Sequence, residues 1–372
     1  MRAFVFTDKA LERYAGQFVW LAIDTENSTN ANFLTKYPIN VWPTLMIIDP
    51  KKESVALRYA GGATLPQLTK LLNDGAKVVG GAKSKADEAI ARGDGLVNEK
   101  KSAEAAAAYA EAIKAAPKNW SRLGRAAESL MFALYVSHDY DRCAAEGLEL
   151  YPRVKGTYSA ASVASNGLAC ASEKPENRAA FDTLEKATRE TLDNPKIPLS
   201  GDDRSGLYET LISARVAVKD EEGALKLRND WATFLEGEAK KAKTAEQRAV
   251  YDSHRITAYV ALKQPERAIP MLEQSERDFP TDYNPPARLG LIYRTMGKYD
   301  DALAAYDRAL PHAYGPRKIS ILRGKAETYA LKGDKESARR TLREAVAYAE
   351  SLPSGQVSDA MMAALKKKLD TM

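Results

Sequence analysis

The chain has 372 residues, of which 45% are hydrophobic and 28% are charged, and its formal net charge is +5. This length exceeds one ordinary core and favours two or more units or an elongated array. The composition excludes a disordered chain. The absence of a run of about 20 apolar residues argues against a membrane helix. The excess of basic residues is mild and spread along the chain, which argues against nucleic acid as a partner.

The first residues predict a short helix and no export signal. The apolar run that ends at Phe6 is followed at once by Asp8 and Lys9, so it lacks the long apolar region of a signal peptide. Asp8 is a suitable N-cap for a helix that continues to Ala15. With no signal or membrane segment in the sequence as given, the default expectation is a cytoplasmic protein.

Residues 18–80 predict alternating strands and helices. The continuous apolar runs at 18–23 and 44–48 read as buried strands, and residues 30–37 as a short helix between them. A turn at 49–52 leads into an alternating strand at 55–59, Gly61-Gly62 ends that strand, and residues 65–72 carry a leucine stripe typical of a helix.

These residues resemble the second half of a thioredoxin domain, with Trp42-Pro43-Thr44 at the place of the family's cis-proline loop. The resemblance covers about the first fifth of the chain. It implies that Pro43 follows a cis peptide bond and that Trp42, Pro43 and Thr44 face a substrate polypeptide. The alternative is that Pro43 simply begins an exposed strand.

The sequence contains no C-x-x-C motif. Cys143 and Cys170 are 27 positions apart, and we expect both to be buried, unpaired residues within helices. The dithiol that the resemblance requires would lie about one turn before Met1, with residues 1–6 as the tail of its helix. We therefore expect no catalytic residue and no cofactor, and the isolated histidines indicate no metal site: His138, His254 and His312.

The implied loss of a central strand leaves the predicted strands 18–23 and 44–48 with unpaired edges. Either these strands pair with each other, or Met1 is an internal methionine of a longer protein.

After a short linker at 77–83, the chain is rich in alanine and helical to its end. Tyr259 and Tyr293 are 34 positions apart, as are Ala268 and Ala302, which is the tetratricopeptide period. The region closely resembles the tetratricopeptide repeat family. The residues that carry the repeat signature are Gly93, Tyr109, Ala112, Tyr259, Ala268, Gly290, Tyr293, Ala302, Tyr306, Tyr329 and Ala338.

The predicted fold class is therefore mostly α: a tetratricopeptide-type α-solenoid at 81–372 preceded by a partial α/β thioredoxin-like domain at 1–80. The repeat pattern weakens between residues 120 and 235, and the loop at 193–205 indicates an insertion or a break between two sub-arrays. We expect roughly seven helix pairs.

An array of this kind exposes a concave face along its first helices, so a protein or peptide is the expected partner, and the oligomeric state stays open. The family's basic clamp for a C-terminal carboxylate is missing, because the matching positions hold Ile90 and Asp94 in one repeat and Ala287 and Leu291 in another. We expect the inward-facing arginines, Arg294 and Arg323, to be solvated or paired with neighbouring acids.

Two functions remain open from the sequence. The first is protein recognition through the concave face, with no dithiol chemistry in the chain as given. The second is a thiol-disulfide oxidoreductase whose C-x-x-C lies upstream of Met1. The codons upstream of Met1 in the same reading frame distinguish them. A strand and a C-x-x-C there would exclude the first function, and a stop codon or an unrelated frame would exclude the second.

Overall fold

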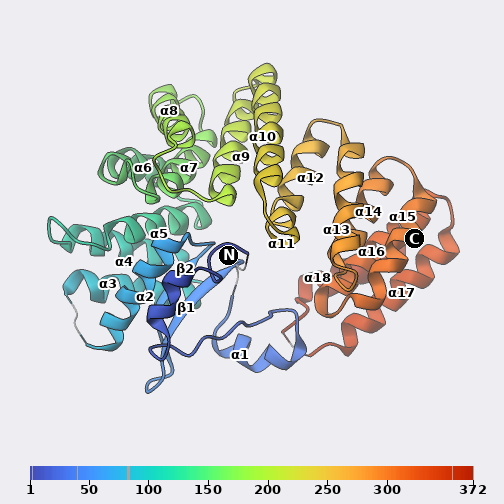
Figure 1. The fold of residues 1–372 in the computed structure, drawn as a ribbon, viewed down its shortest axis with the longest axis horizontal. Helices are drawn as coiled ribbons and strands as arrows, with labels where there is room; N and C mark the ends of the chain where they lie inside the picture. Colours follow the sequence, from blue (N-terminus) through green and yellow to red (C-terminus); the bar gives the residue numbers. More distant parts are fainter. Residues whose placement is uncertain (2, 40, 82–83, 354, 372) are drawn as a thin grey trace. The chain divides into compact units, whose positions relative to one another are not determined.

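The computed structural model describes residues 1, 3–39, 41–81, 84–353 and 355–371. They form two compact units, and each unit contains a stretch from near the N-terminus (Figure 1). Unit 1 consists of Met1–Ala15 and Ile39–Phe234, and unit 2 of Gly16–Pro38 and Leu235–Met372.

Unit 1 begins with a 3₁₀ helix and a β-hairpin and continues as α-helices. Its elements are η1 (Lys9–Tyr14), β1 (Thr44–Asp49), β2 (Ser54–Ala60), α2 (Leu65–Val79), α3 (Lys85–Asn98), α4 (Ser102–Ala115), α5 (Leu123–Val136), α6 (Tyr140–Val154), α7 (Ser159–Ser172), α8 (Arg178–Asp193), α9 (Gly201–Ala217) and the first part of α10 (Glu221–Lys241).

The hairpin and the helix that follows it confirm the predicted elements at 44–48, 55–59 and 65–72. Strands β1 and β2 pair antiparallel, from Thr44 opposite Ala60 to Asp49 opposite Ser54. Helix α2 begins at a capping box formed by Thr64 and Gln67. The helix lies so close to β1 that a Cβ at Gly75 would be 2.2 Å from Cδ1 of Ile47, so the glycine permits this packing.

The predicted strand at 18–23 is wrong. In the described residues the sheet has two strands, β1 and β2, and residues 18–23 have no regular secondary structure. Val19 and Leu21 are 89% and 68% exposed, rather than buried on both faces. An apolar run becomes a strand only when a neighbouring strand satisfies its backbone, and no strand in the described part of the chain pairs with residues 18–23.

The N-terminal residues also differ from the predicted helix tail. The backbone N–H groups of Phe4, Val5 and Phe6 all donate to the carbonyl oxygen of Met1, which makes a set of turns. The short helix predicted after them is present as η1, with Asp8 accepting from the N–H of Ala10 at 2.8 Å.

The helices of both units form antiparallel pairs joined by the same tight turn. In six of these turns one residue has positive φ. The N–H group of the next residue donates to the carbonyl five positions before it, which is the pattern of a Schellman C-cap. The pairs are α3 with α4, α5 with α6, α9 with α10, α12 with α13, α14 with α15 and α16 with α17, and their positive-φ residues are Lys100, His138, Lys219, Lys263, Gly297 and Gly333.

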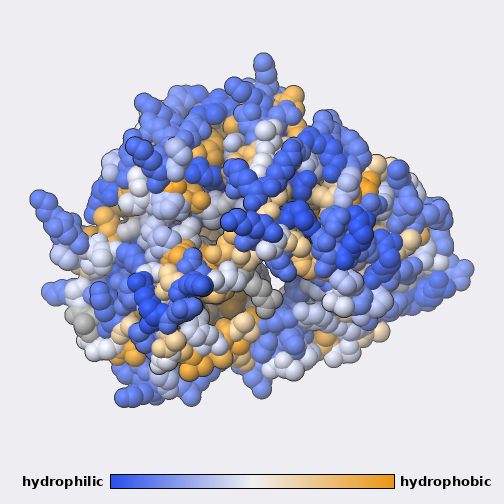
Figure 2. Space-filling model, viewed as in Figure 1, coloured by the Kyte–Doolittle hydropathy of each residue, from blue (hydrophilic) through white to orange (hydrophobic). Residues whose placement is uncertain are grey.

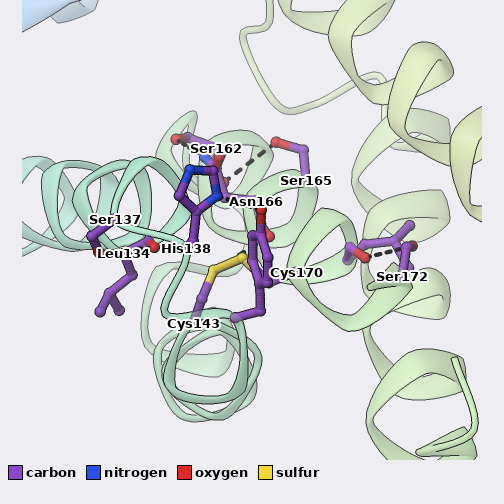
Figure 3. Close-up of a disulfide and its surroundings, with 11 residues drawn as sticks. Leu134, Ser137, His138, Cys143, Ser162, Ser165, Asn166, Cys170 and Ser172 are labelled. Atoms are coloured by element: carbon purple, nitrogen blue, oxygen red, sulfur yellow. Dashed lines mark hydrogen bonds between the residues drawn. A yellow bond between two sulfur atoms is a disulfide. The ribbon is translucent and has the colours of Figure 1, made fainter. Parts of the chain in front are cut away.

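The expectation of two unpaired cysteines is wrong, because Cys143 of α6 and Cys170 of α7 form a disulfide (Figure 3). Their Cα atoms are 5.9 Å apart, and both residues are buried. Helix α7 packs against both α5 and α6, and this packing brings the two cysteines together. Spacing along the chain cannot reveal such an approach, since it depends on how the helices pack.

The elements of unit 2 include two short helices from residues 28–36. They are η2 (Ser28–Asn30), α1 (Ala31–Lys36), the end of α10, α11 (Ala245–Ala249), α12 (Asp252–Ala261), η3 (Pro265–Ala268), α13 (Ile269–Asp278), α14 (Asn284–Thr295), α15 (Tyr299–Ala309), η4 (Leu310–His312), α16 (Gly315–Leu331), α17 (Lys335–Ser351) and α18 (Asp359–Thr371).

Within unit 2, each helix pair packs on the next, and α18 covers α17 at the end of the array. The visible face of α14 to α17 is mainly hydrophilic (Figure 2). Among the described helices of the whole chain, none has the length and hydrophobicity needed to cross a membrane. No cluster of histidine, cysteine, aspartate or glutamate suited to a metal ion occurs in the described part of the chain.

Candidate peptide-binding surfaces

The repeat-signature glycines lie where two helices of a pair touch. A Cβ at Gly93 would be 2.5 Å from the ring of Tyr109, and a Cβ at Gly290 would be 2.6 Å from the ring of Tyr306. Each glycine is on the first helix of its pair and each tyrosine on the second, 16 positions later. The absence of a side chain therefore makes room for the aromatic ring within the pair.

The other repeat-signature residues occupy the helix interfaces. Tyr293 and Tyr329 are half-buried near the ends of their helices, while the remaining members of the set are fully buried. Those buried residues are Ala112, Tyr259, Ala268, Ala302 and Ala338. This burial accounts for small or aromatic residues at these positions through packing.

The Trp42-Pro43-Thr44 loop lies at the start of β1. The Trp42–Pro43 peptide bond is cis, which confirms the predicted isomer. The Thr44 hydroxyl donates to the carbonyl of Val41 at 2.6 Å, and the Gly61 N–H donates to the carbonyl of Pro43 at 2.8 Å. Trp42 is 65% exposed. The loop is thus fixed by its own chain while its indole ring is presented to solvent.

Side chains of α3 and α5 hold the backbone of strand β2. The N–H of Arg58 donates to a carboxylate oxygen of Asp94 at 3.2 Å, and the guanidinium of Arg125 donates to the carbonyl of Arg58 at 3.1 Å. Arg125 also pairs with Asp94, and the Tyr109 hydroxyl donates to Asp94 at 2.9 Å. First helices of two successive pairs therefore grip an extended strand through its main chain.

These polar groups are buried, and their electrostatics follow from that burial. Burial raises the pKa of Asp94 above its ordinary value, although Arg125 opposes the rise. Burial likewise lowers the pKa of Arg58, with Asp94 opposing. A buried ion pair of this kind costs desolvation energy that good hydrogen bonding must offset. The cluster thus depends on every member keeping its partner.

The next residue of β2 meets a second buried acid. Tyr59 forms a hydrogen bond with Glu128 of α5, and Ser159 of α7 forms another. Burial raises the pKa of Glu128 from 4.5 to about 7, and Asp203 of α9 adds to the rise. Strand β2 is therefore bonded by polar side chains of α3 and α5, and side chains of α7 and α9 act on the buried acid that bonds Tyr59.

Unit 2 holds a different stretch of its own chain, at the N-terminal ends of α14 and α16. The Tyr283 hydroxyl donates to a Glu26 carboxylate oxygen at 2.8 Å, and Arg317 pairs with the other oxygen of Glu26. The Tyr314 hydroxyl donates to Asp24 at 2.7 Å. We call Tyr283, Tyr314 and Arg317 the acidic-segment site.

The pKa values at the acidic-segment site reflect these contacts. The hydrogen bond to Asp24 raises the pKa of Tyr314 to about 12. Burial and the Glu26 hydrogen bond raise the pKa of Tyr283, and the Glu26 hydrogen bond also raises the pKa of Arg317. All three side chains are therefore donors to carboxylates at neutral pH.

The backbone of the bound segment is also contacted. A Cβ at Gly315 would lie 2.2 Å from the carbonyl oxygen of Glu26, and the amide of Gln356 donates to the same oxygen at 3.4 Å. A cavity of about 220 Å³ adjoins this contact and includes Tyr348 and Leu352 in its lining. The site therefore contacts both the main chain and the carboxylates of the segment.

The predicted clamp positions have unlike surroundings. Ile90 and Asp94 are buried, Ala287 is half-buried and Leu291 is exposed. The expectation for Arg294 is confirmed, because it pairs with Glu327 and donates to the carbonyl of Gly324 at 3.3 Å. Arg323 is exposed, as expected for a solvated arginine.

Sequence reasoning missed the acidic-segment site. Tyr283, Tyr314 and Arg317 are near one another in sequence, but their acidic partners lie 257 to 291 positions away. Polar residues at the starts of repeat helices were the available signal. Nothing in the spacing identifies the segment that would bind them.

Comparisons with known proteins support the repeat assignment at the C-terminal end. Residues 283–351 match the tetratricopeptide repeat family model. No curated protein matches the chain. These 69 residues include the acidic-segment side chains of α14 and α16, and they are repeats of the tetratricopeptide type.

Several solved structures are similar at low identity. BtubC from P. vanneervenii is 16% identical with a TM-score of 0.39, over 59% of this chain and 91% of that chain. MamA of AMB-1 is 17% identical with a TM-score of 0.31, over 48% of this chain and 95% of that chain. YrrB, described as a TPR protein with an unusual peptide-binding site, is 16% identical with a TM-score of 0.31, over 53% and 88% of the two chains. Likeness at this level identifies neither a partner nor a binding site.

Proposed function

We propose that this chain recognises other polypeptides through the first helices of its helix pairs. The observation that carries the proposal is the grip on β2, where Asp94 and Arg125 bind the N–H and the carbonyl of Arg58. Main-chain recognition of this kind holds an extended segment whatever its side chains are. The match of residues 283–351 to the tetratricopeptide model supports the same function for unit 2.

The exposed part of this surface in unit 2 includes the first-helix position of Leu291. It corresponds to Asp94 in unit 1, but its side chain is 41% exposed. An exposed apolar side chain on this surface suits contact with an apolar partner residue. Unit 2 is therefore the half of the chain in which we place partner binding.

Selection of peptides from a random library on the full chain tests this function. We expect the selected peptides to slow amide exchange in α12, α14 and α16, and we expect Leu291→Arg to weaken their binding at least tenfold. Leu225→Arg is the matched control, because Leu225 is a comparably exposed leucine, 49% accessible, on α10. Selection that yields no peptide above background, or peptides insensitive to Leu291→Arg, would refute the proposal.

A thioredoxin-like role for residues 1–80 is a second candidate, favoured by the β1–β2 hairpin that is followed by helix α2. We propose that the Trp42-Pro43-Thr44 loop docks polypeptide and that the helical array occupies 81–372. Thiol exchange needs a reactive dithiol, whereas Cys143 and Cys170 are buried and bonded to each other. We accordingly expect the chain as given not to reduce insulin. Turnover that persists after both cysteines are replaced by serine would contradict this.

A further inference from the structure

The acidic-segment site combines three donors with a fixed spacing. Tyr283 and Tyr314 lie at the starts of α14 and α16, and their rings meet edge to face with centroids 5.9 Å apart. Arg317 lies in the first turn of α16. Because α14 and α16 pack against each other, the donors are held by rigid helices.

The bound carboxylates belong to residues two positions apart. Asp24 accepts from Tyr314, while Glu26 accepts from Tyr283 and pairs with Arg317. The Asp24 side chain also accepts from the Glu26 N–H at 2.9 Å, which shapes the turn between them. The site therefore binds two carboxylates that are separated by one residue within a turn.

The ligand class is polypeptide rather than a small carboxylic acid. The Glu26 carbonyl oxygen approaches Gly315 so closely that a Cβ there would be 2.2 Å away, and Gln356 donates to the same oxygen. Gly315 also has φ +52, which favours glycine. These contacts recognise a backbone carbonyl that a free dicarboxylate lacks.

Two of the receptor side chains that hold the resident segment are largely exposed. The Arg317 side chain is 60% exposed, and Tyr314 is 43% exposed. Exposed ion pairs contribute little net stability because water competes for both charges. The preceding residues 18–23 have no regular secondary structure, so they add no helix or strand that would have to break on release.

We propose that the acidic-segment site is a receptor for a partner polypeptide bearing an acid-x-acid turn, and that Asp24 and Glu26 occupy it as an internal competitor. The proposal rests on the proposed function and names its partner class. Tethering gives the resident segment a high effective concentration, so a partner binds well only when it outcompetes that segment. The resident segment thereby sets the minimum affinity that a partner needs in order to bind.

Peptide binding to the full chain tests the proposal. The probe is a fluorescein-labelled peptide with the sequence of residues 22–30, and its binding is followed by fluorescence anisotropy. We expect it to bind the Asp24→Asn, Glu26→Gln double variant at least tenfold more tightly than the unaltered chain. A probe with asparagine and glutamine in place of its two acids should lose at least tenfold in affinity.

Variants of the receptor side chains provide the second arm. In the double-variant background, Tyr283→Phe and Arg317→Gln should each weaken the probe about tenfold, in line with the loss of a charge-assisted hydrogen bond. Arg308→Gln is the matched control, since Arg308 is a half-exposed arginine paired with Glu276 on the neighbouring pair. Thermal melting of each variant shows whether the fold is retained.

Four outcomes of the probe and oligomeric-state measurements would overturn the proposal. The first two are equal probe affinity for the unaltered and double-variant chains, and equal affinity of the double-variant chain for the acidic and neutral probes. The third is displacement of the probe by free glutarate at the concentration at which unlabelled peptide displaces it. The fourth is an unaltered chain that forms a dimer, which the double variant dissociates. The last outcome would identify the occupant as a second copy. Library peptides that bind through Leu291 but ignore Arg317 would refute this inference and leave the proposed function standing.

Discussion

Helix pairs α3–α4 and α14–α15 share one packing device and differ in what they hold. Both place a glycine under a tyrosine ring, Gly93 under Tyr109 and Gly290 under Tyr306. The residue after the glycine is Asp94 in the first pair and Leu291 in the second. Asp94 is buried against β2, whereas Leu291 is exposed. The glycine–tyrosine contact that joins the two helices is thus independent of the residue that follows the glycine. That residue binds β2 in the first pair and is exposed in the second.

The largest expected effect on stability comes from exchanging the residue types at positions 94 and 291. Asp94→Leu leaves Arg125 and the N–H of Arg58 without a carboxylate, and we expect a loss of roughly 3–5 kcal/mol in the stability of unit 1. Leu291→Asp changes an exposed side chain and should cost about 0.5 kcal/mol or less. Urea unfolding, with amide exchange in β2 as a local readout, measures both. Similar losses of stability in the two variants would contradict the conclusion that only the residue at position 94 has a buried structural role.

The pH dependence of the two units should have opposite signs. Glu128 keeps its proton in the folded chain up to a pKa of about 7, instead of 4.5, so the folded state binds more protons between these values. Stability from this group is full below pH 4.5 and falls as pH rises to about 7, by roughly 3 kcal/mol. Glu128→Gln should remove this slope. Amide exchange in α5 as a function of pH measures it.

Glu327 is the matched acid of unit 2. Burial opposes the change, but the hydrogen bond from Lys368 and the charge of Arg294 lower its pKa. Its contribution is therefore present above its ordinary pKa and is lost as pH falls. Glu327→Gln should reduce acid sensitivity in α16, and a slope of the same sign as that of Glu128 would contradict the assignment.

The glycine–tyrosine contacts should respond alike in both units. Gly93→Ala and Gly290→Ala place a methyl group within 2.5 and 2.6 Å of a ring, so each should cost about 1–3 kcal/mol. Gly95→Ala is the control, because no atom lies within 4 Å of its added Cβ. That variant should be neutral or stabilising by up to about 1 kcal/mol. Thermal melts showing no difference between Gly93→Ala and Gly95→Ala would refute the contact.

The smallest expected effect concerns the turns within pairs. Lys263 adopts φ 58 and Gly297 adopts φ 74 at equivalent positions. Lys263→Gly should stabilise by several tenths of a kcal/mol, and Gly297→Lys should destabilise by about 1 kcal/mol, because the left-handed region disfavours a Cβ. Melting temperatures that move in the opposite directions would show that the turns are not equivalent.

Local patterns made much of the helical part predictable. The 34-residue period locates the pairs around Tyr259 and Tyr293, and glycine identifies two of the turns, at Gly297 and Gly333. In four other pairs a lysine or histidine takes the left-handed conformation, so the same turn gives no glycine signal. The pattern weakens in the middle of the chain partly for this reason.

The errors arose where long-range partners decide the outcome. Residues 18–23 have the composition of a strand but belong to a segment held by unit 2. The disulfide between Cys143 and Cys170 depends on the approach of α6 and α7. The acidic-segment site depends on side chains at opposite ends of the sequence. Composition and period describe local preference, and none of these three features is local.

Unit 2 is assembled from the beginning and the end of the chain, and this affects the order of its synthesis. Glu26 emerges 291 residues before Arg317. At about 5–20 residues per second, the acidic segment waits roughly 15–60 seconds for its receptor. Unit 1 receives its last residue, Phe234, within that interval, while Asp24 and Glu26 are available to any other basic or tyrosine-rich surface. The acidic segment thus meets the solvent, and any factor present during translation, before it meets its own site.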